Sequence, residues 1–117
     1  MADLIVEGDE LVVSLSPLEK LAALRGNVRL PIRAVREVAV EPAPWQALRG
    51  IRAPGTGIPG VLAYSVRRRT GDRPDFAAIH GSRPAVRIEL DPPADFGRVL
   101  ITVDDPQAAV AAVRRQG

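Results

Sequence analysis

Apolar and polar residues alternate in several short runs along this chain, which is the pattern of half-buried β-strands. The first two runs, residues 4–7 and 10–15, flank the pair Gly8-Asp9. Glycine followed by aspartate between two apolar runs is typical of a tight turn. The segment is therefore predicted to form a β-hairpin or two halves of one bent strand.

A further strand is predicted from residue 28, where Val28, Leu30 and Ile32 alternate with polar neighbours or proline. Pro31 has no amide hydrogen to donate, so this strand is expected at a sheet edge or at a bulge. The alternation slips near Val35 and then resumes. We therefore expect the segment to break or bend there before it continues to about residue 41.

Four more strands follow in the second half of the chain. Gly81-Ser82 is a turn signal, and it predicts that the strands before and after it form a hairpin. In the second strand of this hairpin, Val86, Ile88 and Leu90 share one face. The four predicted strands are residues 61–67, 76–80, 85–90 and 99–103.

Two helices are predicted from their capping residues. Ser16 and Glu19 form a capping box around a proline, which predicts a short helix over residues 17–25. Asp105 is placed to cap a C-terminal helix that begins at Pro106 and has an alanine- and valine-rich face.

Residues 42–60 interrupt the strand pattern with four prolines, four glycines and the only tryptophan, Trp45. Residues 46–48 are predicted to form a helical turn, and the glycines further on are typical of turns. The stretch is interpreted as a rigid crossover rather than a strand, with Trp45 packing it down. An alternative is that Trp45 anchors a contact with another molecule.

These elements predict one mainly β domain (class α+β) that spans residues 1–117. About seven bent antiparallel strands would form a small barrel, or a strongly bent sandwich, closed by the C-terminal helix. The short helix near residues 17–25 would lie in the first loop region.

The order of segments, with RAPGTGIPG at residues 52–60 and HGSRPAV at residues 80–86, resembles bacterial pleckstrin-homology-like (PH-like) domains. The resemblance covers nearly the whole chain. It implies a seven-stranded, strongly bent sheet closed by one helix, and it brings no catalytic residues. Such folds serve as binding platforms for phosphoinositides, peptides or other domains, and some bacterial members form rings. A fold alone does not decide among these roles.

The formal net charge of +2 conceals an uneven distribution. Residues 1–19 carry five acids and no base, whereas residues 20–73 carry eleven bases and three acids. Fifteen of the sixteen basic residues are arginine, which either reflects a GC-rich genome or favours bidentate anion recognition. The absence of cysteine from the sequence excludes disulfides and thiolate metal sites. Neither a signal peptide nor an apolar span is evident, so a cytoplasmic location is expected, with peripheral membrane association as an alternative.

The densest basic cluster is Arg67, Arg68 and Arg69, with Arg73 close behind. It is either a patch for phosphate groups or an acidic partner, or a solvated hairpin tip that protects an edge from aggregation.

A second pair of candidates, Arg49 and Arg52, flanks the glycine-rich segment. This arrangement is either an anion-binding nest of backbone amides with arginine, or the rigid crossover alone. The segment lacks the Gly-Lys-Ser/Thr ending of a nucleotide-binding loop.

The sequence therefore predicts a non-enzymatic binding or scaffolding module that engages a protein partner or assembles with copies of itself. The alternative is peripheral binding to an anionic membrane lipid or a phosphorylated ligand through the arginine-rich tip. No catalytic residue, metal or cofactor is predicted, because the single histidine, His80, has no evident catalytic partner. Nucleic-acid binding is not expected, because aromatic residues that stack on bases are scarce.

Overall fold

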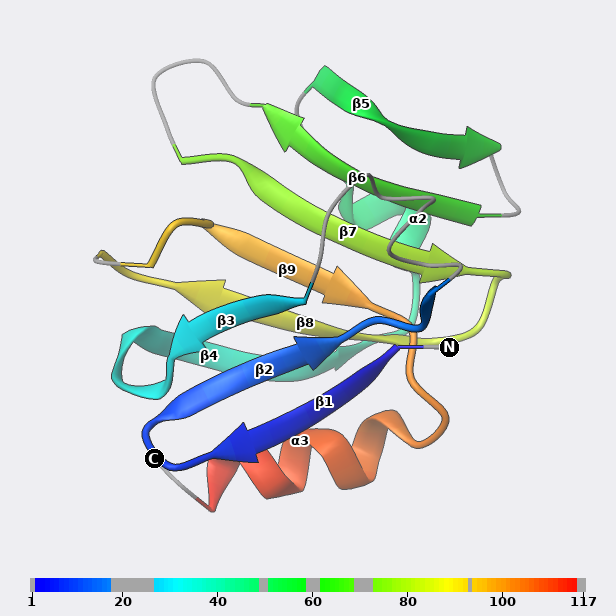
Figure 1. Ribbon diagram of the computed structural model, residues 1–117. Coiled ribbons are helices and arrows are strands. Elements are labelled where there is room, and N and C mark those ends of the chain that lie inside the picture. Colours follow the sequence, from blue (N-terminus) through cyan, green and yellow to red (C-terminus); the bar gives the residue numbers. More distant parts are fainter. Residues whose placement is uncertain are drawn as a thin grey trace.

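The computed structural model describes residues 2–17, 27–48, 51–58, 62–68, 73–92 and 94–115 (Figure 1). For residues 51–58 and 62–68 the description covers the backbone. These parts form one three-stranded sheet and one six-stranded sheet.

The three-stranded sheet contains β1 (Asp3–Glu7), β2 (Glu10–Ser14) and β3 (Val28–Pro31), in that order and antiparallel. Gly8 has φ of +60° in the turn between β1 and β2, a conformation that favours glycine. The predicted hairpin is confirmed. Pro31 lies on an edge strand, also as predicted.

The predicted break near Val35 is also confirmed, and it transfers the chain from one sheet to the other. A short 3₁₀ turn, η1 (Ile32–Ala34), separates β3 from β4 (Val35–Glu41). The amide of Ile32 donates to the carbonyl of Asp9 at 2.9 Å, which ties the turn to the small sheet. The strand that continues as β4 belongs to the large sheet.

The large sheet has the order β4-β8-β9-β7-β6-β5. The predicted hairpin of residues 76–80 with 85–90 is wrong, because β9 lies between β7 and β8. It pairs parallel to β7 and antiparallel to β8. Every residue from Asp75 to Ile79 is buried, so both faces of β7 are covered, and its parallel partner β9 is likewise buried from Val99 to Ile101. The remaining strands are β5 (Ile51–Ile58), β6 (Leu62–Arg68), β7 (Asp75–His80), β8 (Ala85–Leu90) and β9 (Arg98–Ile101).

Three further expectations are corrected by these sheets. Neither sheet closes into a barrel. The described residues alone form nine strands rather than about seven, and one pair is parallel. The stretch 42–60 contains a strand, β5, although its prolines and glycines argued against one. A terminal strand tolerates these residues, and Pro54 lies where the register with β6 shifts, between Arg52 and Gly55.

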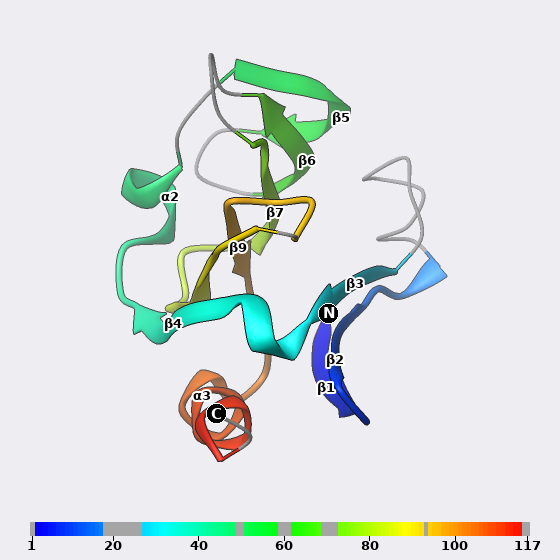
Figure 2. The ribbon, with the colours of Figure 1, turned by 90° about the vertical axis from the view of Figure 1, so that its left-hand side faces the viewer.

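Two helices complete the described fold: α2 (Pro44–Ala47) and α3 (Pro106–Arg114). The predicted cap of α3 is confirmed, since the Ala108 amide donates to Oδ1 of Asp105 at 3.0 Å. Helix α3 contacts β4, β8 and β1, and so covers the space between the two sheets (Figure 2). The helix predicted at residues 17–25 lies outside the described residues beyond Pro17. In the described ranges no helix has the length and hydropathy needed to cross a membrane.

The main hydrophobic core lies between the two sheets and α3, and includes Leu11, Leu30, Phe76 and Ile88. A second apolar cluster lies on the opposite face of the large sheet. There Trp45, Ala47 and Leu48, in and just after α2, pack against buried side chains of β7 and β9. Figure 2 shows the large sheet between α2 and the small sheet. The second cluster is formed by Ala77, Ile79 and Leu100.

Candidate functional site

The β5–β6 register brings together two groups of arginines that lie apart in the sequence. Arg52 pairs with Arg67, and Ile51 pairs with Arg68. The sequence pattern assigned Arg52 to the glycine-rich segment and Arg67 with Arg68 to a separate tip. Two further members of these groups, Arg49 and Arg69, lie outside the described residues.

Arg73 is held by the loop that precedes β9. Its guanidinium donates to the carbonyls of Ala94 at 3.1 Å, Phe96 at 3.0 Å and Leu90 at 2.7 Å. Hydrogen bonds from a charged donor are stronger than neutral ones. Arg73 therefore fastens residues 90–96 to the start of β7, a role that the sequence did not suggest.

A row of charged positions crosses the whole large sheet. The register places a charged residue of each strand beside a charged residue of the next, from β5 at one end to β4 at the other. The row is Arg52, Arg67, Asp75, Arg98, Glu89 and Glu37. It begins with two cations and ends with two carboxylates. Sequence reasoning missed it because strand pairing, rather than any local motif, aligns these positions.

Glu89 is the most buried side chain of the described β9–β8–β4 part of this row, with 7% of its side chain exposed. Its Oε2 atom accepts from Nε of Arg98 at 2.8 Å and from Nη1 of Arg87 at 2.8 Å. Arg87 also bridges to Oε1 of Glu37 at 2.8 Å, which offsets the repulsion between the two carboxylates of the row. These contacts join β4, β8 and β9.

The charges set the ionisation of this cluster. Burial alone would raise the pKa of Glu89, but the hydrogen bonds and charges of Arg87 and Arg98 outweigh it and lower that pKa below its ordinary value. The hydrogen bond to Glu89 is also the main reason why the pKa of Arg87 is raised. Both groups are therefore charged at neutral pH.

Helix α2 is fastened to the same face of the sheet. Nη1 of Arg98 donates to the carbonyl of Ala47 at 3.0 Å. The indole Nε1 of Trp45 donates to the carbonyl of Gly81 at 2.9 Å, and its ring packs on the second apolar cluster. Trp45 thus packs the segment down, which agrees with one of the two expectations for it.

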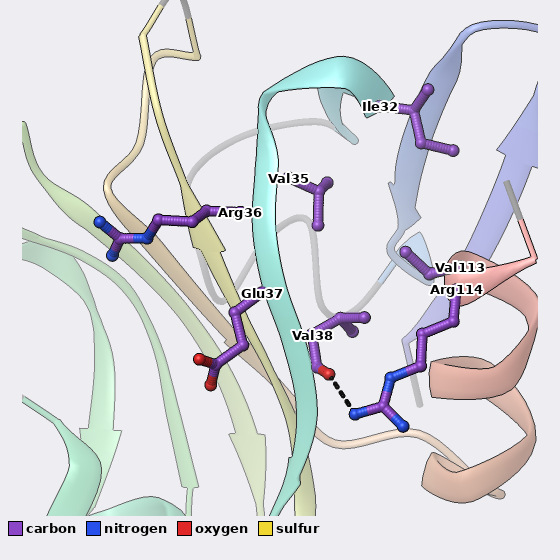
Figure 3. Close-up of a pocket in the computed structure, with 7 residues that line it drawn as sticks. All are labelled: Ile32, Val35, Arg36, Glu37, Val38, Val113 and Arg114. Carbon is purple, nitrogen blue, oxygen red and sulfur yellow. Dashed lines mark hydrogen bonds between the residues drawn. The ribbon is translucent and has the colours of Figure 1, made fainter. Parts of the chain in front are cut away.

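The β4 end of the large sheet is covered. Nη2 of Arg114, on α3, donates to the carbonyl of Val38 at 2.9 Å. Figure 3 shows Val35 and Val38 directed toward α3, and Arg36 directed to the other side of β4. Between β4 and α3 lies a hollow of about 430 Å³, whose lining is mainly apolar. A second hollow of about 390 Å³ lies on the other side of Arg114.

No metal site is evident in the part of the chain that the structure describes, which has no group of three His, Asp or Glu side chains placed to hold an ion. No protein-family model, no curated protein and no solved structure matches the chain.

Proposed function

We propose that the chain is a non-enzymatic binding module that receives an extended segment of a protein partner along the outer edge of β5. The observation that carries this proposal is the difference between the two ends of the large sheet. At one end, α3 packs against β4, and Arg114 donates a hydrogen bond to the carbonyl of Val38, which points away from the sheet. At the other end β5 is terminal, and in the described ranges only β6 pairs with it.

The position of β5 favours access by another chain. In Figures 1 and 2, β5 lies at the top of the molecule, and α3 and the small sheet lie toward the bottom. A terminal strand presents a row of backbone donors and acceptors that a further strand can pair with. The binding energy of such a strand comes mainly from backbone hydrogen bonds, and its specificity comes from neighbouring side chains.

The two halves of β5 differ in how well they suit pairing. Proline and bulges protect an edge, and the first half contains both Pro54 and the register shift. In the second half, residues 55–58 pair with four consecutive residues of β6 without a shift. We therefore place the hydrogen-bonded part of the interface along residues 55–58.

Membership of the PH-like family remains a proposal. It is supported by the β-rich arrangement and by a C-terminal helix packed against both sheets. Such a family assignment is compatible with a binding role, but a fold does not choose the ligand.

A second candidate function is binding to an anionic membrane surface or a phosphorylated ligand. The observation that favours it is the pairing of Arg52 with Arg67, next to Arg68. Sedimentation with phosphatidylserine vesicles tests it, since binding should weaken with salt and disappear when these three residues are changed to glutamate. Equal sedimentation with neutral phosphatidylcholine vesicles would contradict it.

The experiment for the main proposal selects binders from a random octapeptide display library and maps where the strongest one binds. Hydrogen exchange should slow at the amides of residues 55–58 when the peptide is added. Protection confined to the small sheet or to α3, or a library without binders, overturns the proposal. Light scattering at high concentration is the parallel test for self-assembly.

A further inference from the structure

The β5 end of the charged row places two cations in direct register. Arg67 has Asp75 in register on β7, and Arg98 lies between Asp75 and Glu89. Arg52, in contrast, has only Arg67 in register on the one strand that pairs with β5. It is the one cation of the row without a carboxylate at a neighbouring register position in the described sheet.

Like charges in direct cross-strand register repel, whereas opposite charges attract. A segment that pairs with residues 55–58 and continues past the register shift would place one residue beside Arg52, on the side away from Arg67. An acidic residue at that position would give Arg52 the carboxylate neighbour that Arg67 and Arg98 already have. A lysine there would make three cations in succession.

We propose that the β5 edge selects an extended segment of a different protein that carries Asp or Glu at the position in register with Arg52. This inference rests on the proposed function and adds the chemistry of the partner. The acidic side chain extends the charged row by one strand, while residues 55–58 supply the backbone pairing.

Pairing of β5 with β5 of a second copy would not supply this acid. Residues 51–58 contain no Asp or Glu, so antiparallel pairing of two β5 strands leaves Arg52 without an acid. The acidic strand β1 pairs with β2 on one side, and it contacts α3. The charge requirement therefore favours a separate partner over the pairing of two β5 strands.

The test uses the octapeptide with the strongest effect on β5 exchange. Glu, Gln or Lys is placed at each position in turn, and Kd is measured by fluorescence anisotropy at low salt. At one position, Glu should bind roughly two- to fivefold more tightly than Gln, and Lys more weakly than both. That preference should shrink as salt is added.

Variants of the protein assign the preference to Arg52. In Arg52→Gln the Glu and Gln peptides should bind equally, whereas Arg52→Lys should retain part of the preference. The matched control is Arg33→Gln, which removes the same charge from an exposed position on η1 and should leave the preference intact. The exchange pattern of each variant without peptide verifies its fold.

The outcomes separate the inference from the proposal beneath it. If β5 is protected but the Glu, Gln and Lys peptides bind equally, the acidic preference is wrong and the binding edge stands. The same holds if Arg33→Gln abolishes the preference as fully as Arg52→Gln does. If β5 is never protected, both are wrong.

Discussion

Nε of Arg98 lies 2.8 Å from Oε2 of Glu89, and this ion pair links β9 to β8 on the face of the sheet that also carries α2. Arg98 reaches α2 through the Ala47 carbonyl, and Glu89 reaches β4 through Arg87 and Glu37. The ion pairs of one buried carboxylate therefore link three strands and, through Arg98, a helix.

Changing Glu89 to Gln should destabilise the fold substantially. The substitution leaves Arg87 and Arg98 without their shared carboxylate, and removing one member of a buried ion pair costs about 3–5 kcal/mol. Urea unfolding monitored by circular dichroism measures this. The control Glu37→Gln removes a half-exposed carboxylate from the same network and should cost less than about 1 kcal/mol. Equal losses in the two variants would contradict the central position of Glu89.

The stability of the protein should fall in acid because of the same residue. The pKa of Glu89 in the fold lies below its ordinary value of 4.5, so the unfolded chain binds the proton more readily. The stabilisation is fully present above that ordinary value and is lost as pH falls through the folded value. Free energies of unfolding between pH 3 and 7 should show this slope in the native protein. The slope should be smaller in Glu89→Gln, and an unchanged slope would assign it to other groups.

Arg73→Met should loosen the loop before β9 without affecting the β5 edge. The substitution removes the hydrogen bonds to the carbonyls of Leu90, Ala94 and Phe96. The free energy of unfolding should fall by about 2–3 kcal/mol. Thermal unfolding provides the measurement. Arg115→Met, an exposed position at the end of α3, is the control and should stay within about 0.5 kcal/mol. If instead Arg73→Met keeps full stability but loses binding to phosphatidylserine vesicles, Arg73 acts in anion binding with Arg67 and Arg68.

Arg114→Ala should open the covered end of the sheet. Losing the bond to the Val38 carbonyl should cost about 1 kcal/mol and leave an outward acceptor on β4. Because exposed strand edges promote association, light scattering should also detect more oligomer in this variant than in Arg115→Ala. A variant that stays monomeric at high concentration would mean that α3 alone covers the edge.

Part of the candidate site was predictable. The sequence singled out Arg52, Arg67 and Arg68 because arginines are dense there, and it treated them as two groups. Their pairing depends on β5 being a strand, which the prolines and glycines of that stretch concealed. Asp75, Glu89 and Arg98 gave no signal, since they lie in separate segments of the sequence and only strand pairing aligns them.

Local chemistry by itself determined the hairpin at Gly8, the edge position of Pro31, the break before Val35 and the Asp105 cap, because each depends on residues a few positions apart. Tertiary structure alone decided the insertion of β9 between β7 and β8, and with it the charged row. Both depend on which strands bury one another's faces across the whole chain. A turn signal such as Gly81-Ser82 predicts that the strands on either side of it pair. Packing between segments that are distant in the sequence decides which strands do pair.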